Sequence, residues 1–345
     1  MRYKKLGNSE LEVSEICLGT MTFGQQNTET ESHEQLDMAL AYGVNFIDTA
    51  EMYSIPPSQD TYGRTEEIIG HWLKKTGNRD KIVLASKVIG RADWLPHIRD
   101  GKACLDRKNI EQAIEQSLKR LQTDYLDLYQ VHWPDRETNF FGKLGYQFSD
   151  LNAGVAIEET LIVLDDLVKA GKVRHIGISN ETPWGTMEYL RLSEKLNLPR
   201  IISIQNPYNL LNRSFEIGLS EICHREYISL LAYSPLGFGT LTGKYLDQQP
   251  ENARLSLFPN YRRYSTENGI AATQAYVALA HKHGLTPAQM ALSFINSRPF
   301  VGSIIVGATH LDQLKENLKS IEVTLSDSLL EEIEAIQQRY PNPCP

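Results

Sequence analysis

The stretch Val44-Asn45-Phe46-Ile47-Asp48 decides the fold, because a short apolar run ends on a single acidic residue. Two later stretches repeat this design: residues 82–86 are followed by Lys87, and residues 125–131 by His132. Short, mostly apolar runs of this kind are typical of buried parallel strands. Since the carboxyl ends of parallel strands meet at one edge, we expect these polar side chains to lie together.

Working outward, the chain repeats a strand followed by a helix-period segment, which predicts parallel strands joined by crossover helices. Eight strands are expected to begin near Ile16, Asn45, Ile82, Tyr125, Arg174, Ile202, Ser229 and Ser303. The helical segments are residues 31–42, 65–75, 107–121, 157–170, 183–196, 215–226, 287–297 and 311–320. Eight pairs predict an α/β fold, a closed (β/α)8 TIM barrel formed as a single domain by residues 1–345.

Three pieces exceed the eight units. Residues 1–14 predict an N-terminal β-hairpin that turns at Gly7-Asn8-Ser9, and extra helices are expected at residues 266–283, after the seventh strand, and 326–340, at the C-terminus. The long connections 54–62, 89–104, 134–155 and 236–264 each follow a strand, so they are expected on the carboxyl face, where such barrels carry active sites. The sequence does not predict the conformations of these connections.

Composition favours a protein that works on small molecules. The 35 Lys and Arg residues are scattered and outweighed by 43 Asp and Glu residues, which argues against a nucleic-acid partner. Neither a signal peptide nor a stretch of the roughly 20 apolar residues that a membrane helix needs is present. The four cysteines show no CxxC spacing and predict reduced thiols. We therefore expect a cytoplasmic protein with no membrane partner; its oligomeric state is not predicted.

The polar residues at the strand ends suit proton transfer to a carbonyl group. Tyr53 follows Asp48 by five residues, and a free tyrosine, with a pKa near 10, exchanges protons poorly at neutral pH. A nearby Lys87 ammonium would favour the phenolate, Asp48 would keep that lysine charged, and His132 could orient a carbonyl oxygen. Individually such residues are usually caps or packing residues; together they make a general acid.

The chain resembles the aldo-keto reductase family over nearly its whole length. The matching motifs are residues 43–53, with Asp48 and Tyr53, Ala85-Ser86-Lys87-Val88, residues 129–133 around His132, and residues 171–180. The long inserts and Asp106-Arg107-Lys108-Asn109 resemble the bacterial Tas-type branch. The resemblance implies NADPH-dependent reduction of an aldehyde or ketone, with Tyr53 as proton donor, Asp48 and Lys87 tuning it, and His132 positioning the carbonyl.

The sequence departs from the family pattern after the catalytic tyrosine. The usual Tyr-Gly-x-x-Glu match occurs nine residues later, at Tyr62-Gly63-Arg64-Thr65-Glu66, whereas Tyr53 is followed by Ser54-Ile55-Pro56-Pro57. We assign the proton donor to Tyr53 because its spacing from Asp48 is kept, which makes residues 54–62 an insertion. Tyr62 stays open as the alternative.

The cofactor is expected to bind without a dinucleotide fingerprint. No GxGxxG follows a strand, and residues 237–245 fail the spacing of a phosphate-binding P-loop. The resemblance implies that Tyr233 stacks on the nicotinamide, that its carboxamide contacts Ser179, Asn180 and Gln205, and that Ser234, Leu236 and Gly239 supply loop contacts. It further implies phosphate contacts from Lys244 and Arg254, adenosine-phosphate contacts from Gly307, Thr309 and Gln313, and adenine contacts from Glu316 and Asn317. Two cations favour NADP(H) over NAD(H).

An apolar substrate pocket is expected from the long loops. Its candidate residues are Phe23, Met52, Trp94 and Trp133, together with Phe140 and Phe141. Each of these also suits ordinary packing. No metal is expected, because ligand-spaced His or carboxylate clusters are lacking. The second functional interpretation is a nicotinamide-binding regulatory or redox-sensing subunit, because the family includes potassium-channel beta subunits.

Overall fold

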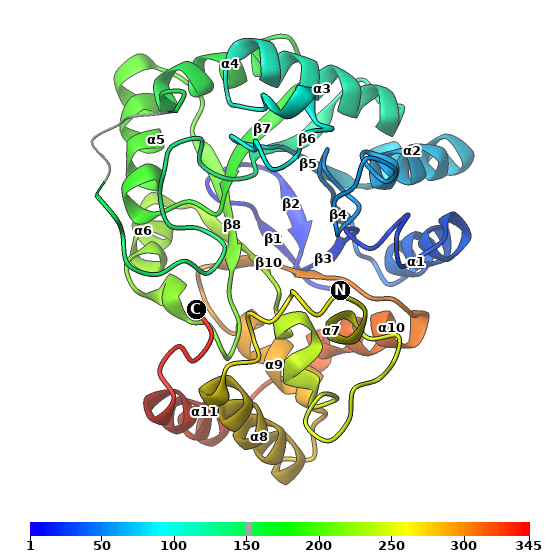
Figure 1. The fold of residues 1–345 in the computed structure, drawn as a ribbon, viewed down its shortest axis with the longest axis vertical. Helices are drawn as coiled ribbons and strands as arrows, with labels where there is room; N and C mark the ends of the chain where they lie inside the picture. The colour runs from blue at the N-terminus through cyan, green and yellow to red at the C-terminus, as the bar shows by residue number, and fades with distance from the viewer. Residues whose placement is uncertain (149–153) are drawn as a thin grey trace.

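The computed structural model describes residues 1–148 and 154–345. Eight parallel strands close into a barrel in the order β10-β3-β4-β5-β6-β7-β8-β9, and helices surround them (Figure 1). The strands are β3 (Ile16–Gly19), β4 (Phe46–Asp48), β5 (Val83–Val88), β6 (Leu126–Val131), β7 (Val173–Ser179), β8 (Ile201–Pro207), β9 (Ser229–Tyr233) and β10 (Val301–Val306). The predicted TIM barrel is confirmed, and all eight predicted strands are present.

The crossover helices follow the predicted segments closely. They are α1 (Glu29–Ala41), α2 (Arg64–Thr76), α3 (Arg107–Leu121), α4 (Ile157–Lys169), α5 (Pro183–Leu196), α6 (Leu219–Glu226), α9 (Pro287–Asn296) and α10 (Leu311–Lys319). Side-chain N-caps begin four of them, at Thr28, Asp106, Thr182 and Thr286. These oxygens satisfy backbone N–H groups that lack helical partners. The predicted starts of α3, α5 and α9 are correct, whereas α1 begins two residues before its predicted start.

One predicted helix is divided. The segment expected at residues 215–226 forms a 3₁₀ turn, η3 (Ser214–Glu216), and then α6. Gly218 between them has φ +98°, a backbone conformation that no α-helix contains. Further elements not predicted are α7 (Arg254–Leu257), η1 (Arg79–Lys81), η2 (Arg99–Gly101), η4 (Gly237–Thr242) and η5 (Ser320–Glu322).

The predicted hairpin, β1 (Tyr3–Lys5) and β2 (Glu12–Ser14), closes the amino-terminal end of the barrel. Leu6 and Val13 are buried with interior barrel residues such as Phe46 and Leu128. Gly7 at its turn has φ +59°, and a Cβ atom there would lie 2.3 Å from the carbonyl oxygen of Ile202. The turn therefore requires glycine.

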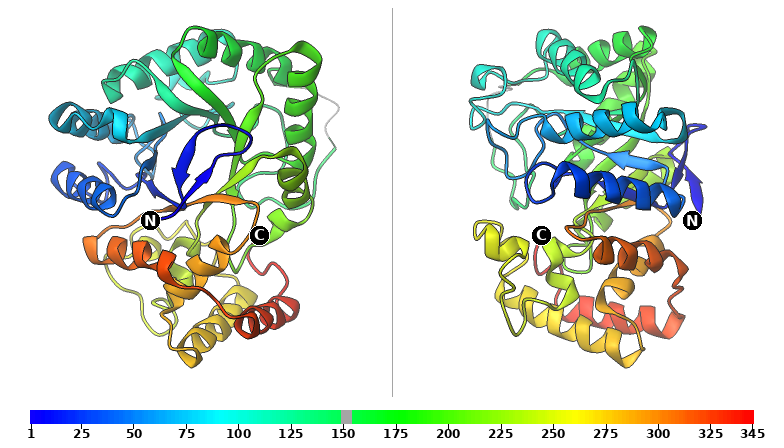
Figure 2. Two further views of the ribbon diagram at one scale, coloured as in Figure 1. Left: turned by 180° about the vertical axis from the view of Figure 1, so that it is seen from behind. Right: turned by 90° about the vertical axis from the view of Figure 1, so that its right-hand side faces the viewer.

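The extra helices and loops lie where the sequence predicts them. Helices α8 (Glu267–Lys282) and α11 (Asp327–Arg339) pack together at the lower edge of Figure 1. Figure 2 shows the β1–β2 hairpin at one end of the barrel and the long loops at the opposite end. For the predicted loop 134–155, residues 149–153 lie outside the described residues.

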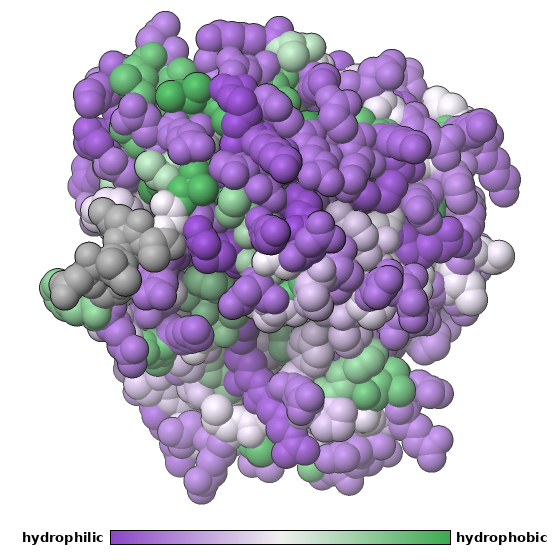
Figure 3. Space-filling model, turned by 45° about the horizontal axis from the view of Figure 1, so that its top comes forward, coloured by the Kyte–Doolittle hydropathy of each residue, from purple (hydrophilic) through white to green (hydrophobic). Residues whose placement is uncertain are grey.

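Hydrophilic residues dominate the surface shown in Figure 3, with hydrophobic residues in scattered clusters. Within residues 1–148 and 154–345, no helix is long and apolar enough to cross a lipid bilayer.

Candidate active site

Four polar side chains converge at the carboxyl end of three neighbouring strands. Asp48 ends β4, Lys87 is the last residue but one of β5, and His132 directly follows β6. Lys87 Nζ donates to Asp48 Oδ2 at 2.6 Å and lies 3.4 Å from the Tyr53 hydroxyl oxygen. The rings of Tyr53 and His132 meet edge to face, with centroids 5.9 Å apart. The structure thus brings together the four residues that the sequence singled out.

Two glutamines hold the Asp48 carboxylate in place. Gln130 Nε2 and Gln205 Nε2 donate to Asp48 Oδ1 at 3.1 and 2.9 Å, while Lys87 occupies the other oxygen. Gln130 was missed in the sequence, although its place two residues before His132 on β6 puts it on the same side of the strand. Gln205, expected at the nicotinamide carboxamide, lines the cavity but already binds Asp48 and Gln130.

The electrostatic state of Tyr53 differs from the expectation. Burial raises the pKa of Tyr53 above its ordinary value, and this effect outweighs the neighbouring Lys87 ammonium, which lowers the pKa. Desolvation disfavours a phenolate, so the buried hydroxyl keeps its proton. A protonated phenol beside an ammonium is a proton donor whose anion would be stabilised as soon as it forms.

Lys87 and His132 are both buried, but their pKa values are shifted in opposite directions. Burial alone lowers the pKa of Lys87, but the Asp48 charge and the hydrogen bonds that Lys87 donates to Asp48 and Tyr53 raise it above the ordinary value. Burial, aided by the Lys87 charge, holds the pKa of His132 well below its ordinary value. At neutral pH the site therefore contains a charged lysine and an uncharged imidazole. Within the described residues, His132 Nδ1 is buried without a hydrogen-bond partner.

The two candidate tyrosines lie in different environments. Tyr53 lines the cavity described below. Tyr62 is not among the lining residues; its hydroxyl lies 3.5 Å from Glu51 Oε2, and the Arg120 guanidinium lies over its ring. Burial and the Glu51 charge raise the pKa of Tyr62 to about 12. The placement of Tyr53 favours its assignment over that of Tyr62.

A cavity of about 990 Å³ extends from these residues to helix α10. All fourteen residues expected at the cofactor line it: Ser179, Asn180, Gln205, Tyr233, Ser234, Leu236, Gly239, Lys244, Arg254, Gly307, Thr309, Gln313, Glu316 and Asn317. Some of them are already connected: Tyr233 donates to Asn180 Oδ1 at 2.7 Å, and Asn180 Nδ2 donates to the carbonyl oxygen of His132. These hydrogen bonds connect residues expected at the cofactor to His132 at the end of β6.

Three of the four residues predicted at the substrate lie at the cavity wall. Met52, Trp94 and Trp133 line the cavity, together with Phe141. Phe23 does not, which corrects its expected place in the pocket. Its side chain is fully buried in the core, and its carbonyl accepts hydrogen bonds from the Ser54 and Thr65 hydroxyls.

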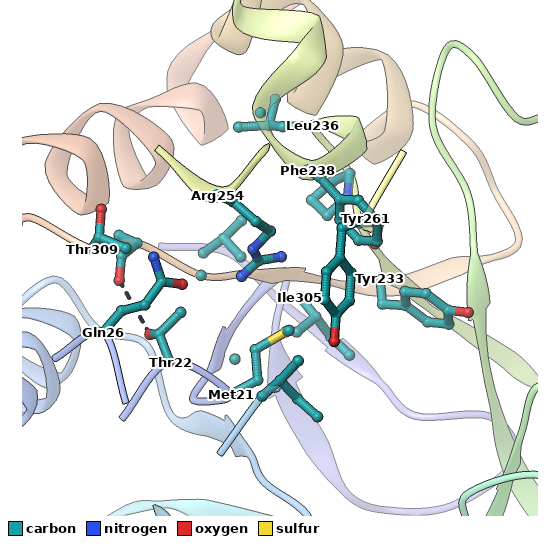
Figure 4. A pocket seen from close by; sticks show the side chains of 18 of the residues that line it. Met21, Thr22, Gln26, Tyr233, Leu236, Phe238, Arg254, Tyr261, Ile305 and Thr309 are labelled. Carbon is teal, nitrogen blue, oxygen red and sulfur yellow. Dashed lines mark hydrogen bonds between the residues drawn. The ribbon is translucent and has the colours of Figure 1, made fainter. Parts of the chain in front are cut away.

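Two cations, Lys244 and Arg254, face the cavity. Burial lowers the pKa of Lys244, and the charge of Arg254 lowers it further; burial also lowers the pKa of Arg254. In the described parts of the chain, neither side chain forms an ion pair, and Figure 4 shows Arg254 reaching into the cavity. Buried cations normally have counter-charges, so this pair fits an anionic group such as a pyrophosphate.

The backbone beside these cations also fits a dinucleotide. Gly239 has φ +89°, and a Cβ atom there would lie 2.9 Å from Lys244 Cε, so glycine leaves room for this lysine. At the other end, Thr309 and Gln313 are linked by hydrogen bonds of 3.2 Å at the start of α10. Free N–H groups at a helix start favour anions.

Several lining residues were missed. Thr20, Met21 and Thr22 follow β3, and the strand-end reasoning applied to β4 would have found them. By contrast, the missed residues 250–253, Tyr261 and Arg263 come from the loop after β9, where no strand end marks their position. In residues 1–148 and 154–345, no cluster of three or more His, Cys, Asp or Glu side chains could hold a metal ion.

Comparison with known proteins identifies the family. The model of the "Aldo/keto reductase family" matches residues 15–338. The chain belongs to the aldo/keto reductase family. It is 55% identical over the full length of both chains to "Protein tas" of Escherichia coli (strain K12). The expected resemblance to the Tas-type branch is therefore confirmed.

Other members of the aldo/keto reductase family are more distant. An "Aldo-keto reductase" of Babesia bovis is 38% identical over 76% of this chain and 98% of its own. A "Probable voltage-gated potassium channel subunit beta" of Arabidopsis thaliana is 32% identical over 99% of this chain and 98% of its own. Membership implies an oxidoreductase that uses a nicotinamide cofactor and small carbonyl compounds.

Proposed function

We propose that this aldo/keto reductase is an NADP(H)-dependent enzyme that reduces aldehydes or ketones to alcohols. The observation that carries the proposal is the protonated Tyr53 phenol at the cavity wall, 3.4 Å from a buried Lys87 ammonium that Asp48 binds at 2.6 Å. Because the carbonyl oxygen gains negative charge as it is reduced, a proton donor placed beside it speeds the reaction.

Each residue of the site has a distinct role in this proposal. When bound, the nicotinamide supplies the hydride. Tyr53 donates its proton to the carbonyl oxygen, and the Lys87 ammonium stabilises the phenolate left behind. Asp48, held by Gln130 and Gln205, keeps Lys87 charged and oriented. The uncharged His132 can donate a hydrogen bond to the same carbonyl oxygen without competing as an acid.

The preference for NADP(H) rests on Lys244 and Arg254. Both are at least half-buried cations without acidic partners in the described residues, and both line the cavity beside Leu236 and Gly239. The 2′-phosphate of NADP(H) would add a second anionic group, beside the pyrophosphate, for these cations to bind. We further propose that the substrate is a small molecule and that the enzyme works in the cytoplasm.

A second candidate function is a nicotinamide-binding regulatory subunit. It is favoured by the full-length similarity to the Arabidopsis protein named as a probable potassium channel subunit beta. The four residues Asp48, Tyr53, Lys87 and His132, called the tetrad below, do not separate these two functions, because the family resemblance implies all four in both. Measuring whether NADPH is consumed separates them.

The direct test follows NADPH absorbance in the presence of aromatic and aliphatic aldehydes, with NADPH binding measured separately by fluorescence quenching. We expect binding together with NADPH consumption that depends on the aldehyde. NADPH binding without consumption with any carbonyl compound would favour the regulatory subunit, and absence of NADPH binding would contradict both functions.

A further inference from the structure

A third cation, Arg263, lines the cavity away from the first two. Its side chain is half-buried, and in the described residues no carboxylate lies within ion-pair distance of it. The charge of Arg254 acts on Lys244, but Arg263 is not among the groups that perturb either of them. The cavity therefore has a paired cation site and a separate guanidinium.

Arg263 belongs to the end of the cavity that holds the tetrad. Burial raises the pKa of Tyr233 and of Tyr264, and the Arg263 guanidinium opposes that rise, so it lies beside both phenols. Tyr233 is bonded to Asn180, which is in turn bonded to the His132 carbonyl. This chain of contacts connects Arg263 to the reacting end.

The other neighbour of Arg263 is the aromatic wall of the substrate side. A Cβ atom on Gly142 would lie 3.0 Å from Arg263 Nε and 3.0 Å from an oxygen of Pro345, so the guanidinium and the last residue of the chain both lie against the residue that follows Phe141. Phe141 meets Trp133 edge to face at 5.7 Å, and Trp133 stacks on Trp94 at 6.0 Å. Trp94, Trp133 and Phe141 thus form an apolar wall of the cavity that Arg263 also lines, and among the described residues Arg263 forms no ion pair.

We propose that Arg263 binds a carboxylate on the substrate, so that the enzyme selects aldehydes or ketones that combine a flat apolar body with an acidic group. This inference rests on the proposed reductase function and specifies its substrate class. Arginine suits the task because its planar fork matches both oxygens of a carboxylate, and partial burial strengthens the attraction. The apolar body would lie against Trp94, Trp133 and Phe141.

The test compares two aldehydes of the same shape, para-formylbenzoate and its uncharged methyl ester. The kcat/KM ratio of acid to ester is measured for the wild type, Arg263→Gln and Arg263→Lys. The control is Arg262→Gln, because the Arg262 side chain is exposed and, among the described residues, hydrogen-bonds only the carbonyl oxygen of Pro259. A charged hydrogen-bonded pair is worth roughly a 10- to 100-fold difference in binding.

We expect the wild type and Arg262→Gln to prefer the acid, and Arg263→Gln to lose that preference by about tenfold or more through a raised KM for the acid. Arg263→Lys should keep part of the preference for the acid, because lysine retains the positive charge but cannot bind both carboxylate oxygens through a planar guanidinium. The inference is overturned if the wild type shows no preference for the acid, or if Arg263→Gln lowers kcat/KM for the acid and for the ester equally. Turnover of the ester with no preference overturns only the carboxylate site, whereas failure to turn over either compound overturns the reductase function as well.

Discussion

At the residue scale, burial sets the chemistry of the candidate site more than any single neighbour does. Buried Tyr53 retains its proton, buried His132 loses its charge, and buried Lys87 keeps its charge only because Asp48 lies 2.6 Å away. An acid, a neutral hydrogen-bond donor and a permanent cation therefore coexist within one small volume. Two of these states lead to predictions about single residues.

The first residue-scale prediction concerns pH and His132. Its pKa in the folded protein lies well below 6.5, so below pH 6.5 the unfolded chain binds a proton that the folded chain does not. The free energy of unfolding should therefore be fully retained above pH 6.5 and fall as pH decreases toward the folded pKa, by up to about 1.4 kcal/mol per pH unit from this residue. Urea unfolding of wild type and His132→Gln at several pH values measures the difference. Parallel pH profiles for the two proteins would contradict the buried neutral imidazole.

The second residue-scale prediction concerns cofactor preference. Lys244→Ala and Arg254→Ala should each weaken NADPH binding more than NADH binding, because only NADPH carries a 2′-phosphate that these side chains could bind. Fluorescence quenching titrations give both dissociation constants, and the exposed Lys315→Ala on α10 is the control. Equal losses for NADPH and NADH in both variants would exclude a 2′-phosphate role for these residues.

At the element scale, a buried ion pair connects the insert 89–104 to the segment after β4 that contains Tyr53. Arg99 donates to both oxygens of Glu51 at 2.6 and 2.9 Å, and the Ile89 N–H donates to the same carboxylate. Both charged side chains are almost completely buried. Glu51 lies two residues before Tyr53, and Trp94 on the insert stacks on Trp133. The Arg99–Glu51 ion pair therefore helps to position both Tyr53 and the wall of the cavity formed by these tryptophans.

Breaking this pair should destabilise the protein strongly. Arg99→Met leaves the Glu51 charge buried without its counter-ion, which typically costs about 3–5 kcal/mol of unfolding free energy. The matched control is Arg107→Met, whose exposed partners Glu111 and Asp166 remain solvated, at a cost of about 0–1 kcal/mol. Urea unfolding of both variants makes the comparison. Similar small losses for the two would show that the insert does not depend on this ion pair.

At the scale of the whole molecule, the fold was largely predictable because each unit carries local signals. Thr182-Pro183 and Thr286-Pro287 mark helix starts with a capping hydroxyl and a proline, and both predicted starts are correct. The division at Gly218 was missed because a glycine inside a helical pattern does not reveal its φ. We propose that the chain is one domain, since the hairpin and the added helices pack on the same barrel.

The candidate site was predictable where residues end strands and less so elsewhere. Asp48, Lys87 and His132 were predicted because each lies at a strand end. Gln130 lies inside a strand, and the sequence alone does not show that its side chain binds Asp48. Phe23 was misplaced because an aromatic residue after a strand suits either core or pocket. Arg263 was missed because the path of a long loop depends on tertiary contacts.

The central claim, that Tyr53 is the proton donor of a reductase, is tested most directly by NADPH consumption with an aldehyde in Tyr53→Phe and Tyr62→Phe. In Tyr53→Phe we predict a loss in kcat of about 100-fold or more, with NADPH binding by fluorescence quenching retained, because only the transferred proton is removed. Tyr62→Phe should keep most of its activity, since Tyr62 does not line the cavity. Full activity in Tyr53→Phe together with loss in Tyr62→Phe would contradict the assignment.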